Sequence, residues 1–236
     1  PRLRHRHDQP FLPLSSVMLE MGEGDVPIVP SATVVPVRDG PQGLEVLLLQ
    51  RNRALKHMGG EWVFPGGRID PSDYPVAGDH DQAALHAAIR ETREEADVQI
   101  TLEQLHFLSH WTTPEGARRR YSTWFFLAVL DADAEIRVDG GEISAHRWVR
   151  PQDAFAEIRD TQSPFRLMPP TFVSLVDLAD FRDCATARAA LGARPPRRYA
   201  PRMIMQEGGV CFLYEEDAGY ANLVEAVSGP RHRTYM

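Results

Sequence analysis

The sequence predicts an α/β layered fold followed by a C-terminal extension. Short apolar runs typical of strands alternate with helical segments over most of the chain, which is the pattern of helices layered on a sheet. The 236 residues, of which 43% are hydrophobic, can bury one good-sized core. We expect an irregular lead-in over residues 1–30, a main domain over 31–160 and an extension packed on that domain over 161–236.

Apolar runs bounded by turn residues predict the strands of the main domain. The expected strands cover residues 32–37, 45–51, 62–64, 105–111, 121–130 and 146–149. The Asp39-Gly40 pair separates the first two strands, and a loop containing Pro114 and Gly116 separates the fourth and fifth.

Two helices are expected between these strands and after them. The first covers residues 81–96, with Asp81 as its N-cap and alanine-rich turns behind it. Its predicted buried stripe is Leu85, Ala88, Ile89 and Thr92, which leaves its glutamates on a different face. Pro151 opens the second helix, which ends near residue 159.

The extension is predicted to contain two further helices and a hairpin. The helices cover residues 171–180 and 183–191, and the hairpin pairs 202–206 with 210–214 around Gly208-Gly209. We interpret the extension as carrying no chemistry by itself. It could pack on the core, form a surface for a homodimer or act as a lid.

The most informative motif is Arg90-Glu91-Thr92-Arg93-Glu94-Glu95. A helix places residues i, i+3 and i+4 together, so the three glutamates crowd one face and repel. Divalent cations such as Mg²⁺ are held by a few carboxylates together with substrate phosphates. The alternative is a solvated acidic face that Arg90 and Arg93 neutralise.

The context of this motif resembles the Nudix hydrolase family. Its signature is G, five residues, E, seven residues, then R-E-U-x-E-E-x-G-U with U aliphatic, and Gly67, Arg90, Glu91, Glu94, Glu95 and Val98 match it. Gly67 lies 23 positions before Arg90 where the signature has 14, so we place a nine-residue insertion near residues 71–79. On that alignment the first glutamate becomes Gln82, and the late glycine becomes Asp97, a residue that tolerates left-handed backbone.

This resemblance implies an α-β-α sandwich around a mixed sheet, over roughly residues 31–158, and a hydrolase of diphosphate bonds. It implies that Glu91, Glu94 and Glu95 bind Mg²⁺ or Mn²⁺, with Glu94 also counted as catalytic, and that Arg90 fixes a glutamate by pairing with it. Gly66 and Gly67, after Phe64-Pro65, would allow the close turn that brings the helix to the site.

A general base is also required, and Glu142 in Gly140-Gly141-Glu142 is the candidate for base or additional ligand. The alternative is a solvated loop glutamate. Glu115 is a second, weaker candidate.

The substrate prediction comes from a second resemblance, to the coenzyme A diphosphatase subgroup. Its pattern places Leu47, Leu48, Arg51, Gly60 and residues 64–67 on expected residue types, with Lys56 in place of arginine. Arg51 and Lys56 could hold the 3′-phosphate of coenzyme A or acyl-coenzyme A. The alternatives are ADP-ribose, a dinucleotide or a nucleotide sugar as substrate, or a non-catalytic nucleotide-binding module.

Composition limits the partners. The net charge of -7 argues against the broad basic surface of a nucleic-acid-binding protein. The longest apolar stretch, residues 124–130, is too short to span a bilayer. The absence of a leader pattern and the presence of only Cys184 and Cys211, interpreted as reduced core residues, predict a cytoplasmic protein.

Overall fold

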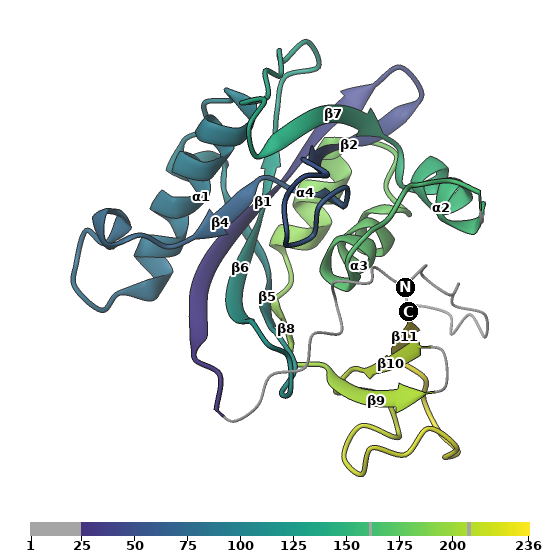
Figure 1. Ribbon diagram of the computed structural model, residues 1–236. Helices are drawn as coiled ribbons and strands as arrows, with labels where there is room; N and C mark the ends of the chain where they lie inside the picture. The colour runs from purple at the N-terminus through teal and green to yellow at the C-terminus, as the bar shows by residue number, and fades with distance from the viewer. Residues whose placement is uncertain (1–24, 161, 207–208) are drawn as a thin grey trace.

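The computed structural model describes residues 25–160, 162–206 and 209–236 and contains a large mixed sheet between helices (Figure 1). The strands of this sheet are β1 (Ile28–Gly40), β2 (Gly43–Arg51), β3 (Trp62–Val63), β4 (Gly66–Arg68), β5 (His106–Thr112), β6 (Arg120–Val129), β7 (Ile143–Val149) and β8 (Arg197–Tyr199). Their order is β3-β2-β1-β6-β5-β8, with β4 added to β1 and β7 to β2. The β1–β6 and β5–β8 pairs are parallel and the others antiparallel, so the sheet is mixed as predicted.

Strand β1 is longer than predicted and starts inside the expected lead-in. It begins at Ile28, because ten consecutive residues of β1 pair in parallel with β6, from Ile28 opposite Arg120 to Val37 opposite Val129. The rest of the predicted lead-in, residues 1–24, lies outside the described residues. Two short strands, β4 and β8, were not predicted.

The helices are α1 (His80–Ala96), α2 (Pro151–Arg159), α3 (Pro169–Leu178) and α4 (Cys184–Gly192), with 3₁₀ turns η1 (Pro71–Asp73) and η2 (Leu102–Gln104). Helix α1 lies on one face of the sheet, and α3 and α4 lie on the other (Figure 1). Alternate residues of β1 separate the two cores, since Val34 packs with the alanines of α1 and Val35 packs with the tail helices.

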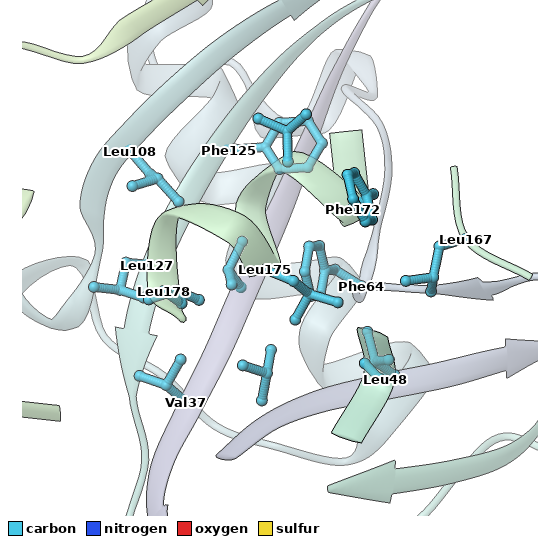
Figure 2. Packing of buried hydrophobic residues seen from close by; sticks show 14 of the residues in the cluster. Val37, Leu48, Phe64, Leu108, Phe125, Leu127, Leu167, Phe172, Leu175 and Leu178 are labelled. Carbon is cyan, nitrogen blue, oxygen red and sulfur yellow. The ribbon is translucent and has the colours of Figure 1, made fainter. Parts of the chain in front are cut away.

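The tail after Ser163 packs on the sheet and contributes to its core. Phe172, Leu175 and Leu178 of α3 are buried against Val37, Leu48 and Leu127 of the sheet and against Phe64 between β3 and β4, as Figure 2 shows. Strand β8 also joins the sheet edge beside β5. The tail therefore supplies the second helical layer of the sandwich.

Helix α1 has a different N-cap from the one predicted, and its buried face matches the predicted stripe only in part. Asp79 is the N-cap, and its side chain accepts the Gln82 N–H. Leu85 and Ile89 are only half-buried, whereas Ala88 and Thr92 are buried as predicted, together with four further alanines and Glu95. Small alanine side chains allow a helix to approach a sheet closely, and this brings Glu95 to the sheet. The helix ends at Asp97 with φ of 55°, so the left-handed conformation expected there is confirmed.

A second, three-stranded sheet follows at the C-terminus, made of β9 (Arg202–Gln206), β10 (Gly209–Leu213) and β11 (Arg233–Tyr235). The antiparallel β9–β10 pairing confirms the predicted hairpin. Cys184 and Cys211 are free and buried, as expected. Among the helices of the described residues, none has the length and apolar character that a membrane span requires.

Candidate active site

A cavity of about 590 Å³ opens on the sheet face that carries the tail. Its floor comes from alternate residues of adjacent strands, because β1 and β6 pair with Ser31 opposite Thr123 and Thr33 opposite Phe125. Successive side chains of a strand point to opposite faces, so these four residues face the same side. One end of the cavity is built by β4 and the carboxylates of α1.

The two glycines of β4 allow α1 to deliver its carboxylates to the cavity. Gly66 and Gly67 pair with Thr33 and Ala32 of β1. The Gly66 N–H donates to Glu95 Oε2 over 2.9 Å. A Cβ atom on Gly67 would overlap the Glu91 carboxylate, and one on Gly66 would overlap the backbone of β1. The requirement for glycine is therefore close approach, in a short strand rather than the predicted turn.

Glu91 and Glu95 line the cavity, and both are shifted toward the neutral form. Burial raises the pKa of Glu95 to about 8, and the charges of Glu91 and Glu142 add to the rise, while the Gly66 N–H opposes it. Burial also raises the pKa of Glu91, against the lowering effect of Arg90. Buried, mutually repelling carboxylates favour a bound cation.

Arg90 organises this group of carboxylates as predicted, but through a partner that sequence reasoning missed. Its Nε and Nη2 donate to the two carboxylate oxygens of Asp73 over 3.0 and 2.8 Å. Its Nη1 donates to Glu91 over 2.8 Å and to Glu94 over 3.1 Å. Burial raises the pKa of Asp73, but the Arg90 hydrogen bonds, the Asp70 N–H and the Arg90 charge together outweigh it, so the pKa is lowered.

Asp73 corrects the alignment with the Nudix signature. It lies six positions after Gly67, which is where the signature has its first glutamate, whereas Gln82 is exposed in the first turn of α1. The extra nine residues therefore lie between Asp73 and Arg90. Counting forward from Gly67 rather than backward from Arg90 would have found Asp73.

The remaining predicted residues divide into those inside the cavity and those outside it. Arg51 and Glu142 both line it, and Arg51 Nη1 donates to Glu142 Oε1 over 2.6 Å. Of the described residues, those that line the cavity do not include Glu94 or Lys56. The Glu94 side chain is 57% exposed, and Lys56 is exposed on the loop after β2.

The Glu142 loop is held by groups that the sequence did not single out. Asp139 accepts the backbone N–H groups of Gly141, Glu142 and Ile143. The Asn52 N–H donates to the Glu142 carbonyl over 2.8 Å, which ties the loop to the end of β2. These bonds fix the loop backbone and thereby bring Glu142 within reach of Arg51.

The donor set fits a hard divalent cation by its chemistry. Glu91, Glu94, Glu95 and Glu142 offer only oxygen atoms, the ligands that Mg²⁺ and Mn²⁺ prefer. Over the ranges that the structure covers, however, no three His, Cys, Asp or Glu side chains already converge as a ligand group. Glu91 and Glu94 instead bind Arg90, and Glu142 binds Arg51. Binding an ion among these carboxylates would require them to turn from their arginine partners.

Comparisons with known proteins point to one family. A family model described as NUDIX domain matches residues 27–169. A Caenorhabditis elegans protein that carries a nudix hydrolase name is 28% identical over 173 residues, covering 58% of this chain and 57% of that protein. A Schizosaccharomyces pombe protein with a nudix hydrolase name is 40% identical over 65 residues, covering 28% of this chain and 20% of that protein. The chain thus spans 57% and 20% of these relatives.

A solved structure shows the same fold. The crystal structure of a NUDIX hydrolase from Alicyclobacillus acidocaldarius matches with a TM-score of 0.63 at 24% identity and covers 73% of this chain and 100% of that chain. The likeness confirms the predicted α/β sandwich around a mixed sheet.

Proposed function

This chain belongs to the Nudix hydrolase family, and we propose that it is a metal-dependent enzyme that cleaves the diphosphate bond of a nucleoside-diphosphate-linked substrate. Nudix hydrolases act on pyrophosphate bonds. The observation that carries the proposal is the placement of the Glu91 and Glu95 carboxylates against the glycines of β4, in the wall of a cavity large enough for a small-molecule ligand.

We propose Glu91, Glu94 and Glu95 as ligands of Mg²⁺ or Mn²⁺. When bound, such ions neutralise phosphate oxygens and lower the pKa of an attacking water. Arg90 would keep Asp73 as its fixed partner and release the glutamates to the ions, because the Asp73 fork uses Nε and Nη2 and the glutamates share Nη1. Arg90 would thus act as a positioning residue.

Glu142 is our proposed general base. Its side chain is 51% exposed at the cavity wall, and its charge acts on the carboxyls of both Glu91 and Glu95, so it lies near the proposed ligands. Arg51 would hold this carboxylate in place while leaving one oxygen to accept a proton from water.

Coenzyme A or acyl-coenzyme A is our proposed substrate. The support is the partial coenzyme A diphosphatase pattern, of which Arg51, Phe64, Gly66 and Gly67 line the cavity. Lys56 lies exposed outside the cavity lining, so it adds no support for recognition of a 3′-phosphate. ADP-ribose, a dinucleotide and a nucleotide sugar are the competing substrates.

A substrate panel with added Mg²⁺ or Mn²⁺ tests this function. Coenzyme A should yield 3′,5′-ADP and phosphopantetheine, and chelation of the metal should abolish the reaction. Cleavage of ADP-ribose alone, with release of AMP, would overturn the substrate but keep the reaction class. Saturable nucleotide binding without cleavage of any diphosphate would overturn the enzyme and favour a binding module.

A further inference from the structure

The end of the cavity opposite β4 is apolar, and the C-terminal tail builds much of it. Trp111 of β5 and Phe125 of β6 form its floor, Pro201 and Phe212 come from the tail, and Met168 and Pro169 come from the start of α3. Trp111 and Phe212 are each at most 4% exposed. Their small accessible surface therefore lies where they line the cavity.

The two ends of the cavity are separated by the order of the strands. Strand β4 pairs with β1, β1 with β6 and β6 with β5, so β4 and β5 lie three strand spacings apart, about 14 Å. Most charged lining residues lie on β2, β4, α1 or the loops beside them. Glu142 lies on the loop before β7, where it binds Arg51, and Arg119 is exposed on the loop between β5 and β6. A ligand with its diphosphate at β4 would extend toward the apolar side chains of Trp111, Phe125 and Phe212.

Stacked rings fix this wall to the sheet. Trp111 stacks on Tyr199 with ring centroids 4.1 Å apart, and Tyr214 meets both rings edge-on at 5.9 and 5.8 Å. Tyr199 lies two positions before Pro201, and Tyr214 lies two positions after Phe212. Since Trp111 belongs both to this ring cluster and to the cavity floor, the tail residues are held at the cavity.

We propose that Phe212 and Pro201 of the tail form a specificity wall for an apolar arm of the substrate, so that a diphosphate bearing an acyl chain is preferred over one joining two nucleosides. This selectivity rests on the diphosphatase function proposed above. It follows because an apolar wall offers no partners to the polar groups of a second nucleoside, and burying polar groups without partners costs free energy. Each methylene that the wall buries should improve binding about fourfold.

The test compares kcat/KM for coenzyme A, its butyryl, hexanoyl and octanoyl thioesters, and diadenosine diphosphate, using the full chain with Mg²⁺. In the wild-type protein we expect kcat/KM to rise about fourfold per methylene until the arm is filled, and the dinucleotide to be poorer than the acyl series. Phe212→Ala should reduce the gain to less than about twofold per methylene, with Phe212→Leu between the two. Met205→Ala is the matched control, because Met205 is 52% exposed on β9 of the same hairpin.

The variants must first be shown to be folded by circular dichroism, and Phe212→Leu replaces Phe212→Ala if the latter unfolds. Acyl selectivity that is unchanged in the folded Phe212 variant, or equally lowered in Met205→Ala, would overturn the proposal. If no diphosphate is cleaved, the proposed function fails. The affinities of the same thioesters, measured by calorimetry, then test the proposed wall independently of catalysis. A chain-length dependence of binding that the Phe212 substitution removes would support the wall, and binding independent of chain length would overturn it.

Discussion

Arg90 beside the cavity and Arg233 in the C-terminal sheet each hold an aspartate with the same fork of hydrogen bonds. Arg90 donates from Nε and Nη2 to the two oxygens of Asp73, and Arg233 donates from the same two nitrogens to Asp217. Burial raises the pKa of each aspartate, but its arginine and the backbone N–H groups that it accepts together outweigh that effect, so both pKa values are lowered.

The two pairs differ in the partner of the remaining nitrogen. Arg90 Nη1 donates to the carboxylates of Glu91 and Glu94, whereas Arg233 Nη1 donates to the backbone carbonyl of Glu225. The Arg90 side chain is 23% exposed and that of Arg233 is 7% exposed. When the remaining Nη1 donates to acidic side chains, as in Arg90, the bidentate pair can position reactive groups. When Nη1 donates to a backbone carbonyl, as in Arg233, the pair can only stabilise the fold.

The largest expected effect comes from breaking the buried Arg233–Asp217 pair with Asp217→Asn. The change leaves the Arg233 cation buried without a counter-charge, which typically costs about 3–5 kcal/mol of the free energy of unfolding. Activity measured well below the unfolding temperature should stay near wild type. Urea denaturation measures the loss, and Glu216→Gln is the control, because Glu216 is 68% exposed and should change stability by less than about 1 kcal/mol. Equal losses of unfolding free energy in the two variants would show that the buried Asp217 pair is no more important for stability than the exposed Glu216.

At the cavity, Glu95→Gln is expected to reduce activity while leaving stability unchanged. Loss of a proposed ligand charge should lower kcat by about 10²–10³-fold. Stability should be kept at neutral pH, because burial already raises the pKa of Glu95 to about 8 and a neutral amide occupies the same space. Steady-state kinetics and thermal melts check both statements, with Glu103→Gln on the exposed η2 turn as the control. Near-native kcat in Glu95→Gln would reject the ligand assignment.

Arg90→Lys should give an intermediate effect. A lysine keeps the charge but cannot make the Asp73 fork and reach the glutamates together, so we expect a loss of about 10–100-fold in kcat/KM or in metal affinity. Arg93→Lys, on an exposed position of the same helix, should leave both quantities unchanged. If the two lysine variants behave alike, Arg90 has no positioning role.

Local pattern was sufficient for most of the fold. The longer strands, α1 and the hairpin were predictable because period and turn residues are local signals, and Asp97 was predictable as a left-handed helix end. Glu95 was misplaced because the buried stripe was assumed to be apolar. Ala88, Thr92 and Glu95 lie along one line of the helix, but only the glycines of β4 explain how a carboxylate fits there.

The apolar wall of the cavity could not be predicted from local sequence patterns. Phe212 and Trp111 line the same cavity although they are about a hundred positions apart, and hairpin periodicity does not tell which sheet the hairpin will meet. Lys56 shows that closeness in sequence is not sufficient, because its exposed side chain is not among the described residues that line the cavity. It follows Arg51 by only five positions, but a loop side chain can leave a site that its neighbouring strand enters.

The smallest expected effect is the acid dependence of the Asp217 pair. Its lowered pKa means that the native state binds its proton less readily than the unfolded chain, whose ordinary value is near 3.8. The stabilisation is therefore present above about pH 4 and is lost as pH falls through the lowered folded pKa. We expect the stability difference between wild type and Asp217→Asn to be constant from pH 7 to about 4 and to shrink below it. Urea denaturation at stepped pH measures this difference. A decline that already begins near pH 6 would mean that other groups, not this carboxylate, control the pair.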